Sequence, residues 1–198
     1  MFFSILNLYK MENKKRDNGF YLKNNQGQVW IETAIYTLIG LTIIVILITS
    51  ATPQIEKIKD KGIISQTTEA LNLLNNEIFE VEQAGGAGRV VYFTVAKGKI
   101  EINAIDNVIQ YSLEDTRLEL TEENETLKEG NIYILTKKRG SRFDIFLTLN
   151  YTDRINMTFD NKKDSKVLHA GTTPYKIQVE NMGDNAPTAD THVDFNLL

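Results

Sequence analysis

A single carboxylate lies inside the longest apolar run of this sequence. Between Val29 and Ala51 the one charged residue is Glu32, which comes five positions after Gly27. A carboxylate in a membrane helix costs roughly 2.5–3.5 kcal/mol at the bilayer centre and less near the interface, so it requires a cationic partner. A cut between Gly27 and Gln28 would create an amino terminus about one helical turn from Glu32, in the same chain or in a neighbour. Glu32 and the Gly27–Gln28 bond are therefore the candidate functional positions.

The apolar run also predicts the topology. Its 23 residues, VWIETAIYTLIGLTIIVILITSA, match the roughly 20 that a helix needs to cross a bilayer. A buried helix of a soluble protein is the alternative, but such helices seldom stay apolar on every face for this length. Residues 1–27 carry five basic and two acidic residues, whereas residues 52–198 carry 17 basic and 23 acidic ones. The positive-inside rule therefore predicts a single-pass membrane protein with a cytoplasmic N-terminus and an extracellular C-terminal domain.

The basic leader, the small Gly27, the apolar helix and the lone Glu32 together resemble the class III signal peptide of prepilins. This leader is typical of the type IV pilin superfamily, and the resemblance is greatest to its archaeal branch. It implies that a prepilin peptidase cuts between Gly27 and Gln28. Glu32, as the fifth mature residue, would then neutralise the terminal amine of a neighbouring subunit. The implied partners are the membrane, the peptidase, other copies or related pilins, and a pilus assembly platform.

The leader departs from the family pattern in two ways. Gln26 stands where archaeal leaders often have a basic residue, and 27 residues is long for a leader. A start at Met11 would leave 17 residues and remove the apolar stretch MFFSILNLYK.

A second helical pattern follows the span. Residues 54–83 place apolar side chains at spacings of seven, three, four and three, which describe one stripe on a helix: Ile64, Leu71, Leu74, Ile78 and Val81. A continuous helix over residues 28–83 would be about 84 Å long. Pro53 could kink it, and Gly62 could soften or break it.

The remaining chain, residues 84–198, predicts a β-rich head. Alternating apolar residues indicate strands around 91–95, 100–104 and 108–114, with turns at Lys97-Gly98 and Asp106-Asn107. Further strands are expected over 131–136, 143–151, 174–180 and 192–197, with a loop over 183–187. The expected fold class is α+β: a long N-terminal helix followed by an antiparallel, sandwich-like extracellular domain. The predicted organisation is a cytoplasmic leader (1–27), the transmembrane helix with its amphipathic extension (28–83), and the head (84–198).

Three N-x-Thr sequons lie in the predicted external part, and they are candidate N-glycosylation sites that fit the predicted orientation: Asn124, Asn150 and Asn156.

No catalytic constellation is evident from the sequence. The chain has no cysteine, and its two histidines, His169 in an expected loop and His192 at an expected strand start, lack a nearby nucleophile pattern. The glycines of residues 85–88 follow a helix and precede a strand, the reverse of a phosphate loop. The acidic run 119–129 lacks the spacing of a calcium loop. We therefore expect no enzymatic activity, cofactor or metal, and the slight overall acidity argues against nucleic acid as a specific ligand.

Three functions from different classes fit these patterns. The first is a pilin-like subunit that polymerises into a cell-surface filament for adhesion or surface contact. The second is a pseudopilin-like accessory of a secretion or assembly machine. The third is an uncleaved signal-anchor protein whose head binds a surface partner. Removal of the leader distinguishes the first two from the third.

Overall fold

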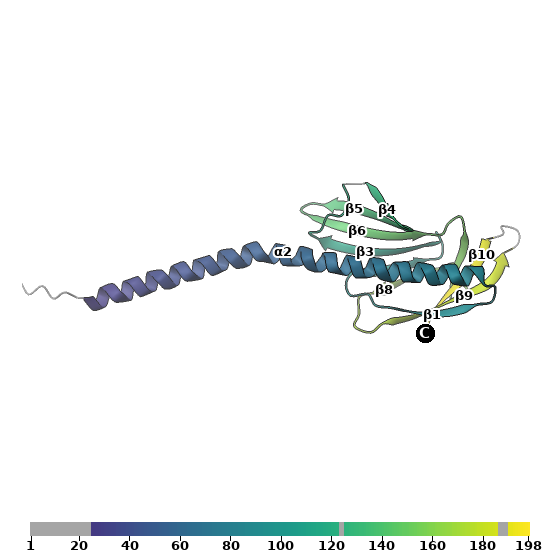
Figure 1. Cartoon of the computed structure of the whole chain (residues 1–198), viewed down its shortest axis with the longest axis horizontal. Helices are drawn as coiled ribbons and strands as arrows, with labels where there is room; N and C mark the ends of the chain where they lie inside the picture. Colours follow the sequence, from purple (N-terminus) through teal and green to yellow (C-terminus); the bar gives the residue numbers. More distant parts are fainter. Residues whose placement is uncertain (1–24, 123–124, 186–189) are drawn as a thin grey trace, which may run out of the picture. The chain divides into compact units, whose positions relative to one another are not determined.

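The computed structural model describes residues 25–122, 125–185 and 190–198, which form one helix and ten β-strands (Figure 1). The chain divides into two compact units, residues 1–49 and residues 50–198. The predicted leader therefore lies almost entirely outside the described residues, as do the alternative start at Met11 and the sequon asparagine Asn124.

The helix α2 (Asn25–Gln83) has 59 residues and continues through both Pro53 and Gly62. The expectation that Gly62 could break it is wrong: glycine costs only about 1 kcal/mol in a helix interior, and the neighbouring turns bury apolar side chains. The predicted apolar stripe is confirmed, because all five of its side chains are buried. The helix ends at Gln83, before a tight turn in which Gly86 has a φ of 72°.

The smaller sheet has four strands in the order β1-β9-β10-β7. Their bounds are β1 (Gly88–Phe93), β7 (Ile155–Phe159), β9 (Tyr175–Asn185) and β10 (Asp190–Leu197). The β1–β9 and β9–β10 pairs are antiparallel, whereas β10 pairs with β7 in parallel. That parallel pair departs from the expected antiparallel arrangement.

The larger sheet has six strands, in the order β4-β5-β6-β3-β2-β8, and every pair is antiparallel. Their bounds are β2 (Lys99–Asn103), β3 (Val108–Thr116), β4 (Thr126–Glu129), β5 (Ile132–Arg139), β6 (Arg142–Asn150) and β8 (Ser165–His169).

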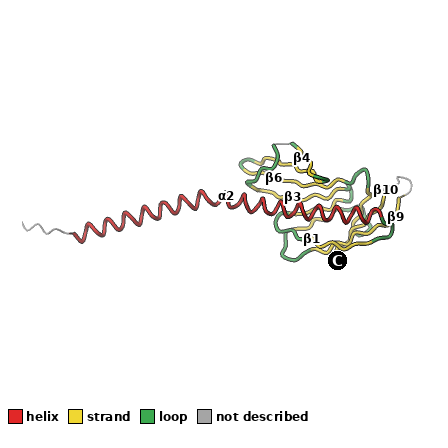
Figure 2. Tube along the Cα trace, viewed as in Figure 1, coloured by secondary structure: helices red, strands yellow, loops and turns green. Residues whose placement is uncertain are grey.

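Both sheets and the second half of α2 share one hydrophobic core. Figure 2 shows this half of α2 running along the strands of the head. Alternate residues of the strands point inward, among them Ile145, Leu147 and Leu149 of β6, which are at most 1% exposed. Leu71 and Leu74 of α2 enter the same cluster. The α+β class is thus confirmed, and the helix is an integral part of the core of the head.

Several strand expectations need correction. Strands β4, β7 and β8 are not among the predicted strands, and His169, expected in a loop, lies at the end of β8. Residues 183–185, expected in a loop, belong to β9, while 186–187 lie outside the described residues. The turn at Lys97-Gly98 does not close a hairpin, because β1 and β2 lie in different sheets. These short or edge strands carry weak alternation, so their partners decide their conformation.

Candidate functional site

The predicted membrane segment is not buried by any of the described residues. No part of its most apolar 18-residue window is buried, and the mean hydropathy of that window is 2.3. Trp30 and Tyr36 are 76% and 73% exposed, and the aliphatic residues around them are about half exposed or more. Among the described residues this is the one helix long and apolar enough to cross a membrane. A surface of this kind needs lipid or other apolar helices around it.

The threonine hydroxyls of this segment are satisfied by the helix itself. Thr33 donates to the carbonyl of Val29 at 2.9 Å, and Thr42 donates to that of Leu38 at 2.8 Å. Thr37 and Thr49 form the same contacts with preceding carbonyls. Such internal bonds remove the cost of placing a hydroxyl in hydrocarbon. The threonines are therefore compatible with a lipid environment.

The sequence-predicted processing and assembly residues occupy the first turns of α2. Gly27 and Gln28 lie within the backbone bounds of the helix, and Glu32 is exposed one turn later. Positions 28 and 32 share a helix face, because residues four apart lie one above the other. The backbone thus brings the candidate cleavage junction and the candidate assembly carboxylate within one turn of each other.

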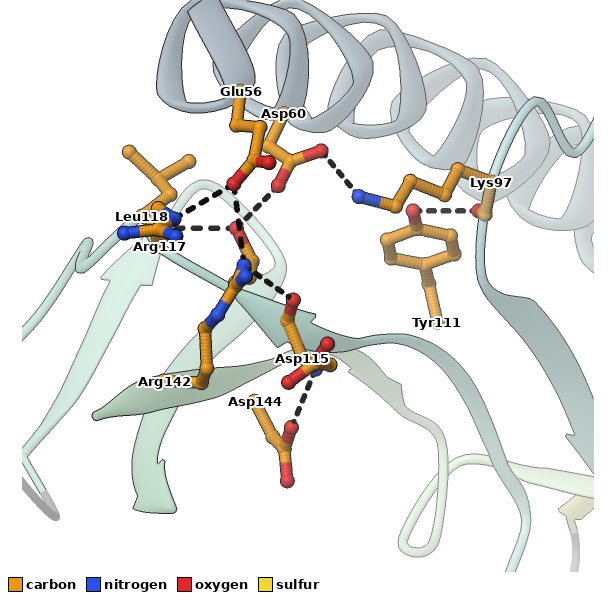
Figure 3. A network of polar contacts seen from close by, with 10 residues as sticks. Glu56, Asp60, Lys97, Tyr111, Asp115, Arg117, Leu118, Arg142 and Asp144 are labelled. Carbon is orange, nitrogen blue, oxygen red and sulfur yellow. Dashed lines mark hydrogen bonds and ion pairs between the residues drawn. The ribbon is translucent and has the colours of Figure 1, made fainter. Parts of the chain in front are cut away.

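A polar network joins the helix to the head soon after the apolar segment ends (Figure 3). Glu56 accepts a hydrogen bond from Arg117 Nε at 2.7 Å and lies 3.3 Å from Arg142 Nη1. One turn further, Asp60 Oδ1 lies 2.6 Å from Lys97 Nζ, and Thr116 donates to its other oxygen. Two carboxylates of one helix face therefore both bind residues at or next to the end of β3, and each also binds a second region, the start of β6 for Glu56 and the segment before β2 for Asp60.

The two carboxylates differ in burial and hence in how much each contributes to the stability of the fold. The Asp60 side chain is 5% exposed, whereas that of Glu56 is 40% exposed. Removing one partner of a buried ion pair is strongly destabilising, whereas an exposed pair contributes about 1 kcal/mol or less. Asp60 is therefore the principal polar attachment of the helix at this end.

Tyr111 holds the backbone of Lys97 in place. Its hydroxyl donates to the Lys97 carbonyl at 2.8 Å, and its ring is fully buried in the core. Burial raises the pKa of Tyr111 to about 12, partly offset by a hydrogen bond with Thr67 and reinforced by the negative charge of Asp60. The phenol therefore remains a neutral donor at physiological pH.

The opposite end of the helix is held by side chains from the smaller sheet and from the turn between β6 and β7. Asn181 of β9 donates to the carbonyls of Val81 and Glu82, two of the orphan acceptors of a helix C-terminus. Glu82 pairs with Arg154 at 2.5 Å. The second half of α2 is thus fixed to the head at both of its ends.

The two sequons in the described part of the chain have different surroundings. Asn150 is exposed at the end of β6, where its side-chain oxygen accepts bonds from the amide and hydroxyl of Thr152. It lines a groove of about 240 Å³ on the outer face of the larger sheet. Asn156 is half-buried in β7, and Thr158 of its sequon is buried and donates to Asp194. Asn150 is thus the more accessible of these two predicted glycosylation sites.

The histidines lie apart. His169 is exposed at the end of β8, and His192 Nε2 is 2.9 Å from the hydroxyl of Thr158. Thr158 forms hydrogen bonds with both His192 and Asp194, so its hydroxyl lies between the imidazole and the carboxylate. In a catalytic triad the imidazole lies in the middle, so this arrangement is not a triad. Among the described residues no cluster of three or more histidine, cysteine or acidic side chains could hold a metal ion.

The sequence analysis missed the attachment network, although one signal for it exists. Asp60 lies four positions before Ile64 and so continues the spacing of the apolar stripe. A carboxylate on a stripe that packs into a core must find a partner there. The partners themselves, Lys97 and Thr116, carry no such signal.

Comparison with known proteins leaves the family open: no protein-family model, no curated protein and no solved structure matches this chain.

Proposed function

We propose that this protein is a pilin-like structural subunit, assembled through its N-terminal helix into a type IV pilus-like filament at the cell surface. In this proposal a prepilin peptidase removes residues 1–27, and the mature chain begins at Gln28. The helix then packs against other copies or related pilins on an assembly platform. The head stays outside the cell, where it serves adhesion or surface contact, and the archaeal branch of the superfamily is the proposed origin of the leader.

The observation that carries the proposal is the unburied apolar half of α2. The side chains from Val29 to Ile48 are not buried by any of the described residues. The same helix continues into the head, where side chains of the head bond to its second half near Asp60 and near Val81. A helix that only anchors a protein needs lipid contact alone. A subunit that must leave the membrane for a filament needs a helix bound firmly to its head, and the network around Asp60 supports that role.

Glu32 has a defined part in this proposal. In a lipid or filament interior its charge costs several kcal/mol unless a cation lies next to it. Cleavage at Gly27–Gln28 creates such a cation in every subunit. Each mature chain then carries both a terminal amine and the Glu32 carboxylate. Pairing of the amine of one subunit with the carboxylate of its neighbour fixes the position of the two helices along the filament axis.

The experiment that tests the proposal is the mass of the N-terminal peptide of the native protein extracted from membranes, with cyclisation or methylation of Gln28 allowed for. A chain that begins at Gln28 supports the proposal. A chain that begins at Met1 or Met11 overturns it in favour of an uncleaved signal anchor.

The variant Gly27→Leu provides the matched control. It enlarges the residue before the cut without changing charge or the apolar run, so insertion should persist while processing stops. Unchanged processing would place the cut elsewhere.

A further inference from the structure

The outer face of the larger sheet carries a groove of about 240 Å³ to which the proposed function gives no role. The four adjoining strands β4, β5, β6 and β3 line it with two aromatic rings and several amide or hydroxyl groups: Tyr133, Phe146, Gln110, Thr126, Thr148 and Asn150. Sites for drug-sized ligands measure about 300 to 1,000 Å³. The groove is therefore suited to a small molecule or to one unit of a larger ligand.

The aromatic ring of Tyr133 offers one face to such a unit. Tyr133 is 38% exposed, and the ammonium of Lys128 lies over its ring, 5.1 Å from the centroid. A cation over the ring occupies one of its two faces, which leaves the other for a ligand. The C–H groups on one side of a sugar ring are positively polarised and pack well against the electron-rich face of an aromatic ring. Since the amide of Gln110 and the hydroxyls of Thr126 and Thr148 can form hydrogen bonds with sugar hydroxyls, the lining fits a saccharide.

Asn150 brings an attachment point for a saccharide to the same groove. Thr148 pairs with Tyr133 across the β5–β6 ladder, and Asn150 follows two residues later on the same face of β6. Tyr133 and Asn150 are thus diagonal neighbours, whose Cα atoms are typically about 7–8 Å apart, within reach of an aromatic side chain. Both also line a second, smaller hollow of about 100 Å³. A group attached to Asn150 therefore begins beside the ring of Tyr133.

The reactive atom of the Asn150 sequon is available for modification. Its Oδ1 accepts hydrogen bonds from the amide and the hydroxyl of Thr152, at 2.9 and 2.6 Å. Its nitrogen Nδ2, the atom that N-glycosylation modifies, donates to none of the described residues. In the neighbouring sequon, by contrast, Asn156 is half-buried and the Thr158 hydroxyl donates to the buried Asp194. Of these two sequons, that of Asn150 combines an exposed asparagine with an adjoining groove.

We propose that Asn150 carries an N-linked glycan and that the first sugars of this glycan lie in the groove, against the ring of Tyr133. The proposal rests on the extracellular placement of residues 52–198 contained in the proposed function. The glycan comes from a lipid-phosphate-linked oligosaccharide: a bond forms between Nδ2 and the anomeric carbon of the first sugar, and the bond from that carbon to the phosphate oxygen breaks. The lipid phosphate leaves, and one proton of Nδ2 is released. The bound sugars cover the outward side of Tyr133 and stabilise the folded head.

Mass spectrometry of the native protein tests the attachment. Trypsin cuts on both sides of residues 143–154, a peptide whose one sequon is that of Asn150, and Asn156 falls in the next peptide. We expect peptide 143–154 to carry the added mass of a series of sugar residues. Thr152→Ser keeps the sequon and should keep the glycan, whereas Thr152→Val should abolish it. An unmodified peptide 143–154 in the native protein would overturn the proposal.

A comparison of glycosylated and unglycosylated protein tests the placement in the groove. The unglycosylated form is the same chain made in cells that lack the oligosaccharide transferase. Urea unfolding of the full chain in detergent should show that the glycan lowers the unfolding equilibrium constant of the head by about two- to tenfold, the range of contacts between stacked rings. Tyr133→Ala should remove this difference between the two forms.

Tyr92→Ala is the matched control. Tyr92 is also an exposed tyrosine on the outward face of a sheet, with the ammonium of Lys176 at 5.7 Å from its ring centroid. It belongs to β1 of the smaller sheet and does not line the groove, so the effect of the glycan should persist in this variant. A glycan on Asn150 whose effect on unfolding is the same with and without Tyr133, or absent in both cases, would overturn its placement in the groove.

The glycan and the proposed function fail separately. A mature chain that begins at Gln28 but has an unmodified Asn150 would overturn the glycan and leave the proposed function intact. A glycan on Asn150 in a chain that begins at Met1 or Met11 would support the glycan and overturn the proposed function.

Discussion

Asp60 of α2 and Lys97, which lies between β1 and β2, form an ion pair of 2.6 Å across 37 residues of sequence. The pair links the helix to the segment that crosses from the smaller sheet to the larger one. Its carboxylate is buried and its ammonium is 45% exposed, so the carboxylate carries most of the desolvation cost.

Asp60→Ala is expected to lower the free energy of unfolding of the head by about 2–3 kcal/mol, because it leaves the Thr116 hydroxyl and the Lys97 ammonium without their acceptor. Urea unfolding of the full chain in detergent, followed by circular dichroism, measures this change. Glu56→Ala removes a half-exposed carboxylate on the same face and should cost about 1 kcal/mol or less. Equal losses for the two variants would contradict the role assigned to Asp60.

Gly98→Ala is expected to destabilise the head by about 3 kcal/mol or more. Gly98 has a φ of 80°, and an added Cβ would lie 2.3 Å from the carbonyl oxygen of Ser112. Gly140→Ala is the control, because Gly140 also has a positive φ, 65°, but has open space around it. That variant should cost about 1 kcal/mol, the conformational strain alone. Similar melting temperatures for both variants would argue against the close approach at Gly98.

Stability should fall as the pH rises from about 10 to 12. Burial raises the pKa of Tyr111 to about 12, and burial also raises the pKa of Tyr151 well above its ordinary value. Above pH 10 the unfolded chain loses these protons while the folded chain keeps them, so the loss is about 1.4 kcal/mol per pH unit for each group.

Unfolding free energies measured across this range test the slope, and Tyr111→Phe should reduce it. Absorbance of the phenolate in the folded protein should show Tyr111 and Tyr151 losing their protons only well above the ordinary tyrosine pKa. A slope unaffected by Tyr111→Phe would count against the assignment.

Glu32→Leu should permit processing but reduce incorporation of the subunit into filaments about tenfold or more, since the loss of one buried charge pair exceeds 1.4 kcal/mol. Immunoblots of sheared filaments and of membranes measure incorporation and processing in the same cells. Thr33→Val alters a neighbouring polar residue whose hydroxyl already bonds within the helix, and it should leave incorporation unchanged. Wild-type incorporation of Glu32→Leu would refute the role of this carboxylate.

Much of the fold follows from local pattern. The apolar run and the stripe from Ile64 to Val81 predict α2, whose period of 3.6 residues is visible without any partner. The alternation around Ile100 and Ile102, and the turn at Asp106-Asn107, likewise predict β2 and the start of β3. For the candidate site, the sequence alone suffices to propose Gly27, Gln28 and Glu32, because the pattern lies within six consecutive residues and needs no tertiary contact.

Only the tertiary structure decides the rest, because it depends on residues far apart in the chain. Strand β8 lies beside β2 and β7 runs parallel to β10, and neither pairing has a local signature. Lys97, the partner of Asp60, is 37 residues away from it, and Arg142, which contacts Glu56, is 86 residues away. The sequence by itself thus determines where the chain is apolar, helical or extended, since those properties depend on nearest neighbours. Folding determines which charges are paired and which remain exposed, since a charge finds its partner only when distant segments meet.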